Sequence, residues 1–164
     1  MNQSMEMAVR VVLIGAGATA VMDAWLMVLK RLKVPTLNFA YIGRWIGNGP
    51  GMRYAQSGIA KAPPVRGESL IGWTAHYAIG IAFAALLLTV CGPEWARNPT
   101  AVPALAVGVA TVVAPLFIMQ PAMGAGVLSS RTPKPLMNCL KSLVNHAVFG
   151  GGLYLAAVAV ARAL

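Results

Sequence analysis

The chain has 164 residues, of which 58% are hydrophobic and only 10% are charged. A soluble domain carries about 25% charged residues, so this composition excludes an ordinary soluble protein and indicates a chain surrounded mostly by lipid. The formal charge of +9 does not call for nucleic acid as a partner, because cytoplasmic loops and contacts with anionic lipid headgroups account for an excess of Lys and Arg.

Four apolar stretches are long enough to cross a bilayer, which takes about 20 residues per helix. They predict helices over residues of about 9–30, 69–91, 101–120 and 139–162. The first stretch ends in a basic cluster, which favours a retained helix over a cleaved signal peptide. We therefore expect an all-α fold, a four-helix integral membrane bundle that forms a single transmembrane domain over residues 1–164.

The connection between the first two helices, residues 30–69, is the only long one. Apolar residues recur at helical spacing around Arg44 and predict a short amphipathic helix over residues of about 37–47, at the membrane interface with Trp45 as its anchor. Several residues that break regular structure follow it: Gly47, Gly49, Pro50, Gly51, Gly58, Pro63 and Pro64.

Pro115 lies inside the third predicted helix. Because proline has no N–H, the carbonyl of Thr111 loses its usual helical donor. The sequence thus predicts a disturbed helix with a free hydrogen-bond acceptor at this point.

Ten of the thirteen Lys and Arg residues, Arg53 among them, lie in or beside the first and third connections. Since cytoplasmic loops hold the excess of basic residues, we expect both connections in the cytoplasm and both termini outside. Cys91 and Cys139 then fall at opposite ends of the bundle and cannot form a disulfide within the chain.

An internal repeat relates the second and fourth predicted helices. Leu70, His76 and Gly80 match Leu140, His146 and Gly150 at a constant offset of 70 residues. The first and third helices match more weakly, with Thr19 set on Thr111. Two helices per repeat favour a parallel repeat about an axis near the membrane normal.

Several short motifs carry a resemblance that covers nearly the whole chain. They are Val21-Met22-Asp23, Gly43-Arg44-Trp45, Pro63-Pro64 through Gly67-Glu68 to His76-Tyr77, Gln120 to Gly126, Ser130 to Pro133 and His146 to Gly150. With them the chain resembles an uncharacterised bacterial family of small multi-pass membrane proteins, a domain of unknown function. The resemblance implies a four-helix fold in the bacterial inner membrane but no chemistry.

Asp23, His76 and His146 are predicted at one depth, roughly 10 Å from the cytoplasmic boundary at 1.5 Å per residue. Ionisable groups inside lipid are costly unless they face the bundle interior and pair, which predicts a shared polar pocket. Other polar residues at a similar level complete the expected ligand or proton pocket: Thr111, Gln120 and Asn145.

Three functions fit these features. The pocket could bind or transport a small ligand or ion, with a homodimer supplying the pathway and Gly124, Gly126 and Gly150-Gly151-Gly152 offering close-packing surfaces. The buried polar residues could instead hold together an accessory subunit of a larger membrane complex.

The third alternative is a redox protein in which His76 and His146 ligate the iron of haem b. A copper site would add sulfur ligands from methionines, with Met119, Met123 and Met137 as candidates. No recognised catalytic motif is present, so enzymatic activity is not expected.

Overall fold

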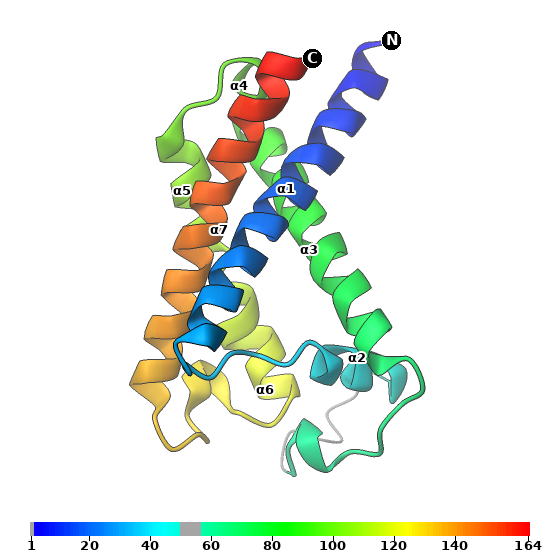
Figure 1. Ribbon diagram of the computed structural model, residues 1–164, viewed down its shortest axis with the longest axis vertical. Helices are drawn as coiled ribbons and strands as arrows, with labels where there is room; N and C mark the ends of the chain where they lie inside the picture. The colour runs from blue at the N-terminus through cyan, green and yellow to red at the C-terminus, as the bar shows by residue number, and fades with distance from the viewer. Residues whose placement is uncertain (1, 50–56) are drawn as a thin grey trace. The chain divides into compact units, whose positions relative to one another are not determined.

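The computed structural model describes residues 2–49 and 57–164, and these residues form helices, turns and loops without a strand (Figure 1). Within these residues, four helical segments are long and apolar enough to cross a membrane: Gln3–Arg31, Glu68–Cys91, Ala101–Ala122 and Pro135–Ala163. The predicted all-α class is confirmed for this part of the chain. Pro50, Gly51 and Arg53, which the sequence placed in the first connection, lie outside the described residues.

Two of the long helices begin earlier than the apolar pattern predicted. Helix α1 (Gln3–Arg31) starts at Gln3 rather than near residue 9, because the Asn2 side chain accepts a hydrogen bond from the Met5 N–H at 2.8 Å and caps the helix. Helix α7 (Pro135–Ala163) starts at Pro135 rather than near residue 139, and proline is favoured in the first turn. The Asn2 cap and the first-turn proline thus extend α1 and α7 beyond their predicted starts.

The third apolar segment is interrupted, as Pro115 predicted. Helix α5 (Ala101–Ala110) ends before a turn at Thr111, and the π-helix η3 (Ala114–Met119) and the short helix α6 (Gln120–Ala122) follow. A missing proline N–H breaks the regular i to i−4 pattern, and a π-helix accommodates the break.

The second connection contains an element that the sequence did not predict. Helix α4 (Pro93–Arg97) follows Gly92, whose φ of 80° is the left-handed conformation that glycine adopts without strain. Trp95 and Ala96 of α4 are buried in the same core as Ile14 of α1. The segment is too short and too polar at its ends to be recognised from hydrophobic periodicity.

The chain divides into two compact units, and each is described by itself. Unit 1 comprises residues 2–36, 77–111 and 145–164, and unit 2 comprises the described residues of 37–76 and 112–144. Helix α3 (Glu68–Cys91) and helix α7 each contribute their first part to unit 2 and the rest to unit 1. Figure 1 shows both termini and α4 at one end of unit 1.

Unit 1 is built on close approaches between helices. A Cβ atom on Gly15 of α1 would lie 2.5 Å from the Ile81 Cα of α3, and one on Gly108 of α5 would collide with the Gly150 backbone of α7. In a membrane no hydrophobic driving force brings helices together, and small residues at the crossings let the backbones approach closely enough to pack. Gly80 and Gly150, which the repeat matches, both lie at such a crossing.

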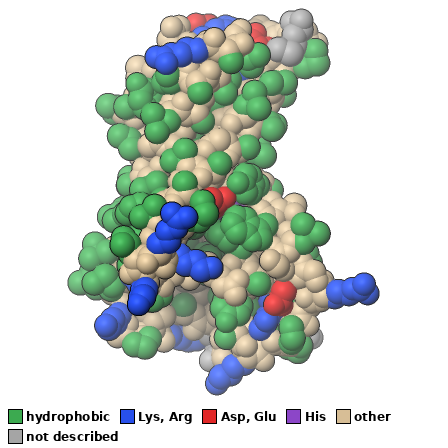
Figure 2. All heavy atoms as spheres, in the orientation of Figure 1, with side chains coloured by type: hydrophobic (Ala, Val, Ile, Leu, Met, Phe, Trp, Pro, Cys, Tyr) green, Lys and Arg blue, Asp and Glu red, His purple; other side chains and the backbone are tan. Residues whose placement is uncertain are grey.

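Hydrophobic side chains also cover the exposed surface of the long helices, as Figure 2 shows for one face. A long helix that is apolar on its outer side as well as its inner side is typical of a membrane span.

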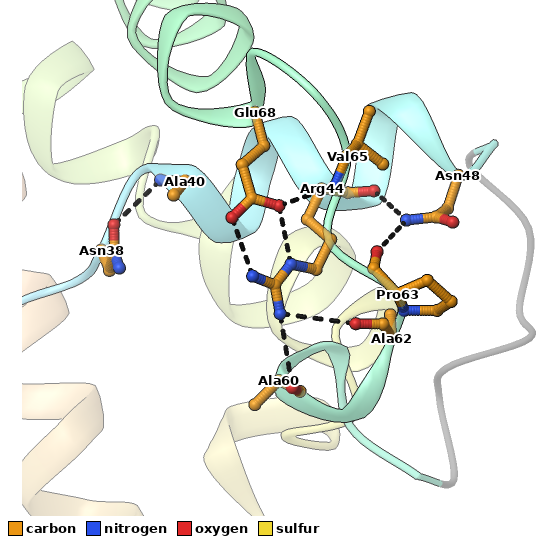
Figure 3. Close-up of polar contacts among 9 residues, drawn as sticks. All are labelled: Asn38, Ala40, Arg44, Asn48, Ala60, Ala62, Pro63, Val65 and Glu68. Atoms are coloured by element: carbon orange, nitrogen blue, oxygen red, sulfur yellow. Dashed lines mark hydrogen bonds and ion pairs between the residues drawn. The ribbon is translucent and has the colours of Figure 1, made fainter.

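Unit 2 contains the predicted short helix of the first connection, α2 (Ala40–Gly47). Its Gly43 packs so tightly on α3 that a Cβ atom would overlap the Glu68 carbonyl. Arg44 then reaches Glu68 and the carbonyls of Ala60 and Ala62 (Figure 3). The described part of the first connection is thus a fixed structure rather than a plain linker.

Candidate functional site

Asp23, the only carboxylate predicted inside an apolar helix, is paired with a tyrosine. The Tyr77 hydroxyl of α3 donates a hydrogen bond to Asp23 Oδ2 of α1 at 3.0 Å. Both residues lie in unit 1 and both are half-buried. The pair links two helices and supplies a donor to a carboxylate in apolar surroundings, where an unsatisfied carboxylate is costly.

Asn145 is paired with a residue that the sequence reasoning missed. The Trp25 indole N–H of α1 donates to Asn145 Oδ1 of α7 at 3.0 Å. Trp25 is not among the predicted site residues, although an indole N–H inside an apolar helix needs an acceptor. That need was the signal that could have identified it.

His146 and Thr111, both predicted site residues, lie together in unit 1. The His146 Nδ1 atom of α7 is 2.9 Å from Thr111 Oγ1, and the same hydroxyl donates to the Gly108 carbonyl at 2.6 Å. Thr111 is only 6% exposed and sits where α5 ends. A hydroxyl has one proton, so a hydroxyl that donates to Gly108 accepts from an N–H on Nδ1. In this arrangement the lone pair of Nε2 is left as an acceptor.

These three pairs connect the four long helices of unit 1 in series. Asp23 and Tyr77 join α1 to α3, Trp25 and Asn145 join α1 to α7, and Thr111 and His146 join α5 to α7. Hydrogen bonds between helices in apolar surroundings contribute about 0.6 kcal/mol each on average. The pairs therefore fix the relative rotation of the helices and also place ionisable groups inside unit 1.

His76, by contrast, belongs to unit 2. Its ring stacks on Phe39, with ring centroids 4.1 Å apart and planes at 25°, and meets the edge of Trp73 at 5.8 Å. Phe39 immediately precedes α2, so the imidazole is part of the contact between the first connection and α3. The sequence did not indicate this aromatic setting.

Gln120 also belongs to unit 2. Its side-chain carbonyl accepts from the Ser129 hydroxyl at 2.7 Å, and its amide lies 3.4 Å from the Ser142 hydroxyl. Gln120 thus holds the third connection against α7. The six predicted site residues divide into four in unit 1, namely Asp23, Thr111, Asn145 and His146, and two in unit 2.

The residues described here contain no group of three or more His, Cys, Asp or Glu side chains that could hold a metal ion. The haem b alternative requires His76 and His146 together, and these belong to different units, so it stays a prediction. The copper variant with methionine ligands stays a prediction as well. Cys91 of unit 1 and Cys139 of unit 2 are free thiols.

An open groove of about 440 Å³ lies on unit 1, between the first turns of α1 and the last turns of α3. None of the predicted site residues lines it; the lining residues are Gln3, Ser4, Met7, Val11, Ala85, Leu88, Thr89 and Pro93.

The helices and the paired polar side chains define the class: a small all-α protein with four helices long and apolar enough to cross a membrane, and with ionisable groups inside them. The chain belongs to the DUF2938 family, described as a protein of unknown function, whose model matches residues 12–160. The predicted membership of an uncharacterised family is confirmed. No curated protein and no solved structure matches the chain.

Proposed function

We propose that this protein is a multi-pass membrane protein that binds a proton or small cation at the paired polar residues of unit 1 and moves it across the bilayer. The observation that carries the proposal is the Asp23 carboxylate, which lies inside an apolar helix and is bonded to Tyr77. Ionisable residues inside membrane helices are costly, and they typically mark ion or proton pathways. His146 would be the second ionisable member of the site.

We place the protein in the bacterial inner membrane with both termini outside. The first and third connections hold most of the Lys and Arg residues, and six of the described ones belong to unit 2, namely Arg44, Lys61, Arg66, Arg131, Lys134 and Lys141. Two of the three remaining basic residues, Arg10 and Arg97, are in ion pairs with Glu6 or Glu94. The basic residues outside the two connections are thus largely neutralised, so the net positive charge is concentrated in the first and third connections. This concentration supports their cytoplasmic assignment.

A homodimer would widen the pathway, but the glycines suggested for its interface are mostly engaged within the chain. Gly150 packs on the backbone of Leu105 and Gly152 on that of Ala18, whereas Gly151 has open space beside it. A dimer contact would accordingly use other surfaces of the long helices.

The experiment is proton flux into vesicles that contain the purified protein, driven by a potassium diffusion potential and followed with a trapped pH-sensitive dye. We expect Asp23→Asn to reduce the flux at least tenfold. The matched control is Thr89→Val, which removes an exposed hydroxyl that donates to the Ala85 carbonyl of its own helix. Equal flux through wild type and Asp23→Asn would exclude proton coupling at this residue.

A structural subunit of a larger membrane complex is the second candidate. The observation that favours it is that Asp23, Asn145 and His146 each have a partner on a neighbouring helix. If wild-type protein gives no flux above empty vesicles, and the chain leaves native membranes in mild detergent as part of an assembly of fixed stoichiometry, this candidate replaces transport.

A further inference from the structure

The basic residues of unit 2 have very little acidic charge to balance them. This unit contains the described cations Arg44, Lys61, Arg66, Arg131, Lys134 and Lys141. Glu68 is the only acidic residue in its sequence ranges, and both carboxylate oxygens of Glu68 accept from Arg44. Lys61, Arg66 and Lys134 are exposed, so their positive charge is available to an external anion.

The two basic connections are joined within unit 2. The Ile59 N–H, at the start of the 3₁₀ helix η2 (Ile59–Lys61), donates to the Met123 carbonyl at 3.0 Å. This backbone bond anchors the segment that carries Lys61 and Arg66 to the start of the third connection. The segment with Lys61 and Arg66 and the third connection with Lys134 are therefore joined parts of one structured unit.

The third connection holds two aliphatic side chains outward on a strained backbone. In the 3₁₀ helix η4 (Val127–Ser129), Leu128 and Ser129 have φ of 52° and 58°, a left-handed backbone conformation that residues other than glycine rarely adopt. Ser129 is 1% exposed and donates to Gln120, which holds the strained turn in place. Val127 and Leu128 remain 47% and 43% exposed. Strain of this kind persists only where the surrounding contacts enforce it.

We propose that Lys61, Arg66, Val127, Leu128 and Lys134 form a surface that binds the headgroups of anionic phospholipids, here named the lipid-contact surface. The three cations contact lipid phosphates, and the two aliphatic side chains enter the boundary between headgroups and acyl chains. Basic residues at a membrane surface attract anionic lipid, and aliphatic side chains beside them add buried apolar area. The proposal is independent of proton binding at Asp23.

The test uses the purified full-length protein in a neutral detergent, titrated with phosphatidylglycerol or with phosphatidylcholine of the same acyl chains. Bound lipid is counted by native mass spectrometry. We expect Lys134→Gln to weaken phosphatidylglycerol binding about fivefold, which corresponds to ~1 kcal/mol per basic residue. Combined with Lys61→Gln and Arg66→Gln, the loss should reach about a hundredfold, and phosphatidylcholine binding should not change.

One control variant and one further test variant make the result specific. Arg162→Gln removes one exposed charge in the last turn of α7, within unit 1, and should change the binding by less than twofold. Leu128→Asn removes the aliphatic side chain and introduces a residue that tolerates the left-handed conformation, so it should weaken binding without disturbing the turn. Binding by the triple variant within twofold of wild type, equal binding of phosphatidylcholine, or full competition by inorganic phosphate would each overturn the proposal.

Discussion

The guanidinium of Arg44 and the carboxylate of Glu68 form a two-bond fork, with Nε to Oε2 at 2.8 Å and Nη2 to Oε1 at 2.7 Å. Glu68 Oε2 also accepts from the Val65 N–H at 3.0 Å, and Arg44 Nη1 donates to the Ala62 carbonyl. The pKa of Arg44 is raised above its usual value, mainly by its side-chain hydrogen bonds to Glu68. One side-chain pair thereby ties α2, the start of α3 and the segment between them.

Replacing Arg44 should therefore destabilise unit 2. Arg44→Lys keeps the charge but cannot reproduce the planar fork, and Arg44→Gln loses both. We expect the thermal midpoint in detergent to fall for both variants and further for Arg44→Gln, as followed by tryptophan fluorescence. Arg162→Gln, the control, should unfold at the wild-type temperature. Equal midpoints for Arg44→Gln and wild type would show that the fork does not stabilise the fold.

The glycines of α7 offer a matched pair of substitutions. A Cβ atom on Gly150 would lie 3.0 Å from the Ala104 carbonyl oxygen and from the Leu105 Cα, whereas one on Gly151 would have no neighbour within 4 Å. Gly150→Ala should cost ~1–3 kcal/mol of unfolding free energy through overpacking. Gly151→Ala should be neutral or stabilising by up to ~1 kcal/mol, because alanine favours helix. The measurement is chemical unfolding in detergent, and the reverse order would contradict this helix packing.

The long helices could be predicted from the sequence because the physical signal is local. Apolar stretches such as Leu70–Val90 show the spans, and Pro115 marks the interruption of the third one through its missing N–H. The starts at Gln3 and Pro135 were not predicted, since they depend on the Asn2 cap and on a first-turn proline and not on the length of an apolar stretch. Helix α4 was missed because its stability comes from the burial of Trp95 in a core formed by distant segments.

The site was predicted less completely because depth can be read from the sequence and helix rotation cannot. The rise per residue placed Asp23 and His146 at similar depth, but the partners Tyr77 and Trp25 depend on how the helices turn toward each other.

The internal repeat shows the same limit of prediction from sequence. Gly80 and Gly150 occupy comparable crossings, yet the Thr19 hydroxyl donates to the Gly15 carbonyl of its own helix, whereas Thr111 also contacts His146.

The contact between Trp25 and Asn145 can be measured by a double-mutant cycle. Trp25→Phe removes the indole donor, Asn145→Leu removes the acceptor, and the double variant removes both. We expect a coupling energy of about 0.6 kcal/mol, the average for hydrogen bonds between membrane helices. Unfolding in a series of denaturing detergent mixtures gives the four free energies. Additive effects of the two substitutions would mean that the bond does not stabilise the protein.

The proton position on His146 is the prediction most closely connected to function. Because the Thr111 hydroxyl donates to the Gly108 carbonyl, the neutral His146 ring should carry its proton on Nδ1. The chain has two histidines, so ¹⁵N NMR of histidine-labelled protein, assigned with a His76→Gln variant, can read each ring directly.

Thr111→Val removes the hydroxyl oxygen that lies 2.9 Å from Nδ1, and it should shift the proton of His146 toward Nε2, because the hydrogen bonds of the ring decide which nitrogen is protonated. Thr111→Ser keeps the hydroxyl and should keep the wild-type spectrum. A wild-type ring already protonated on Nε2, or one unchanged by Thr111→Val, would contradict this role of Thr111. If the Nδ1–H form is found, Nε2 is the atom of His146 that can accept a transported proton, because its lone pair is free.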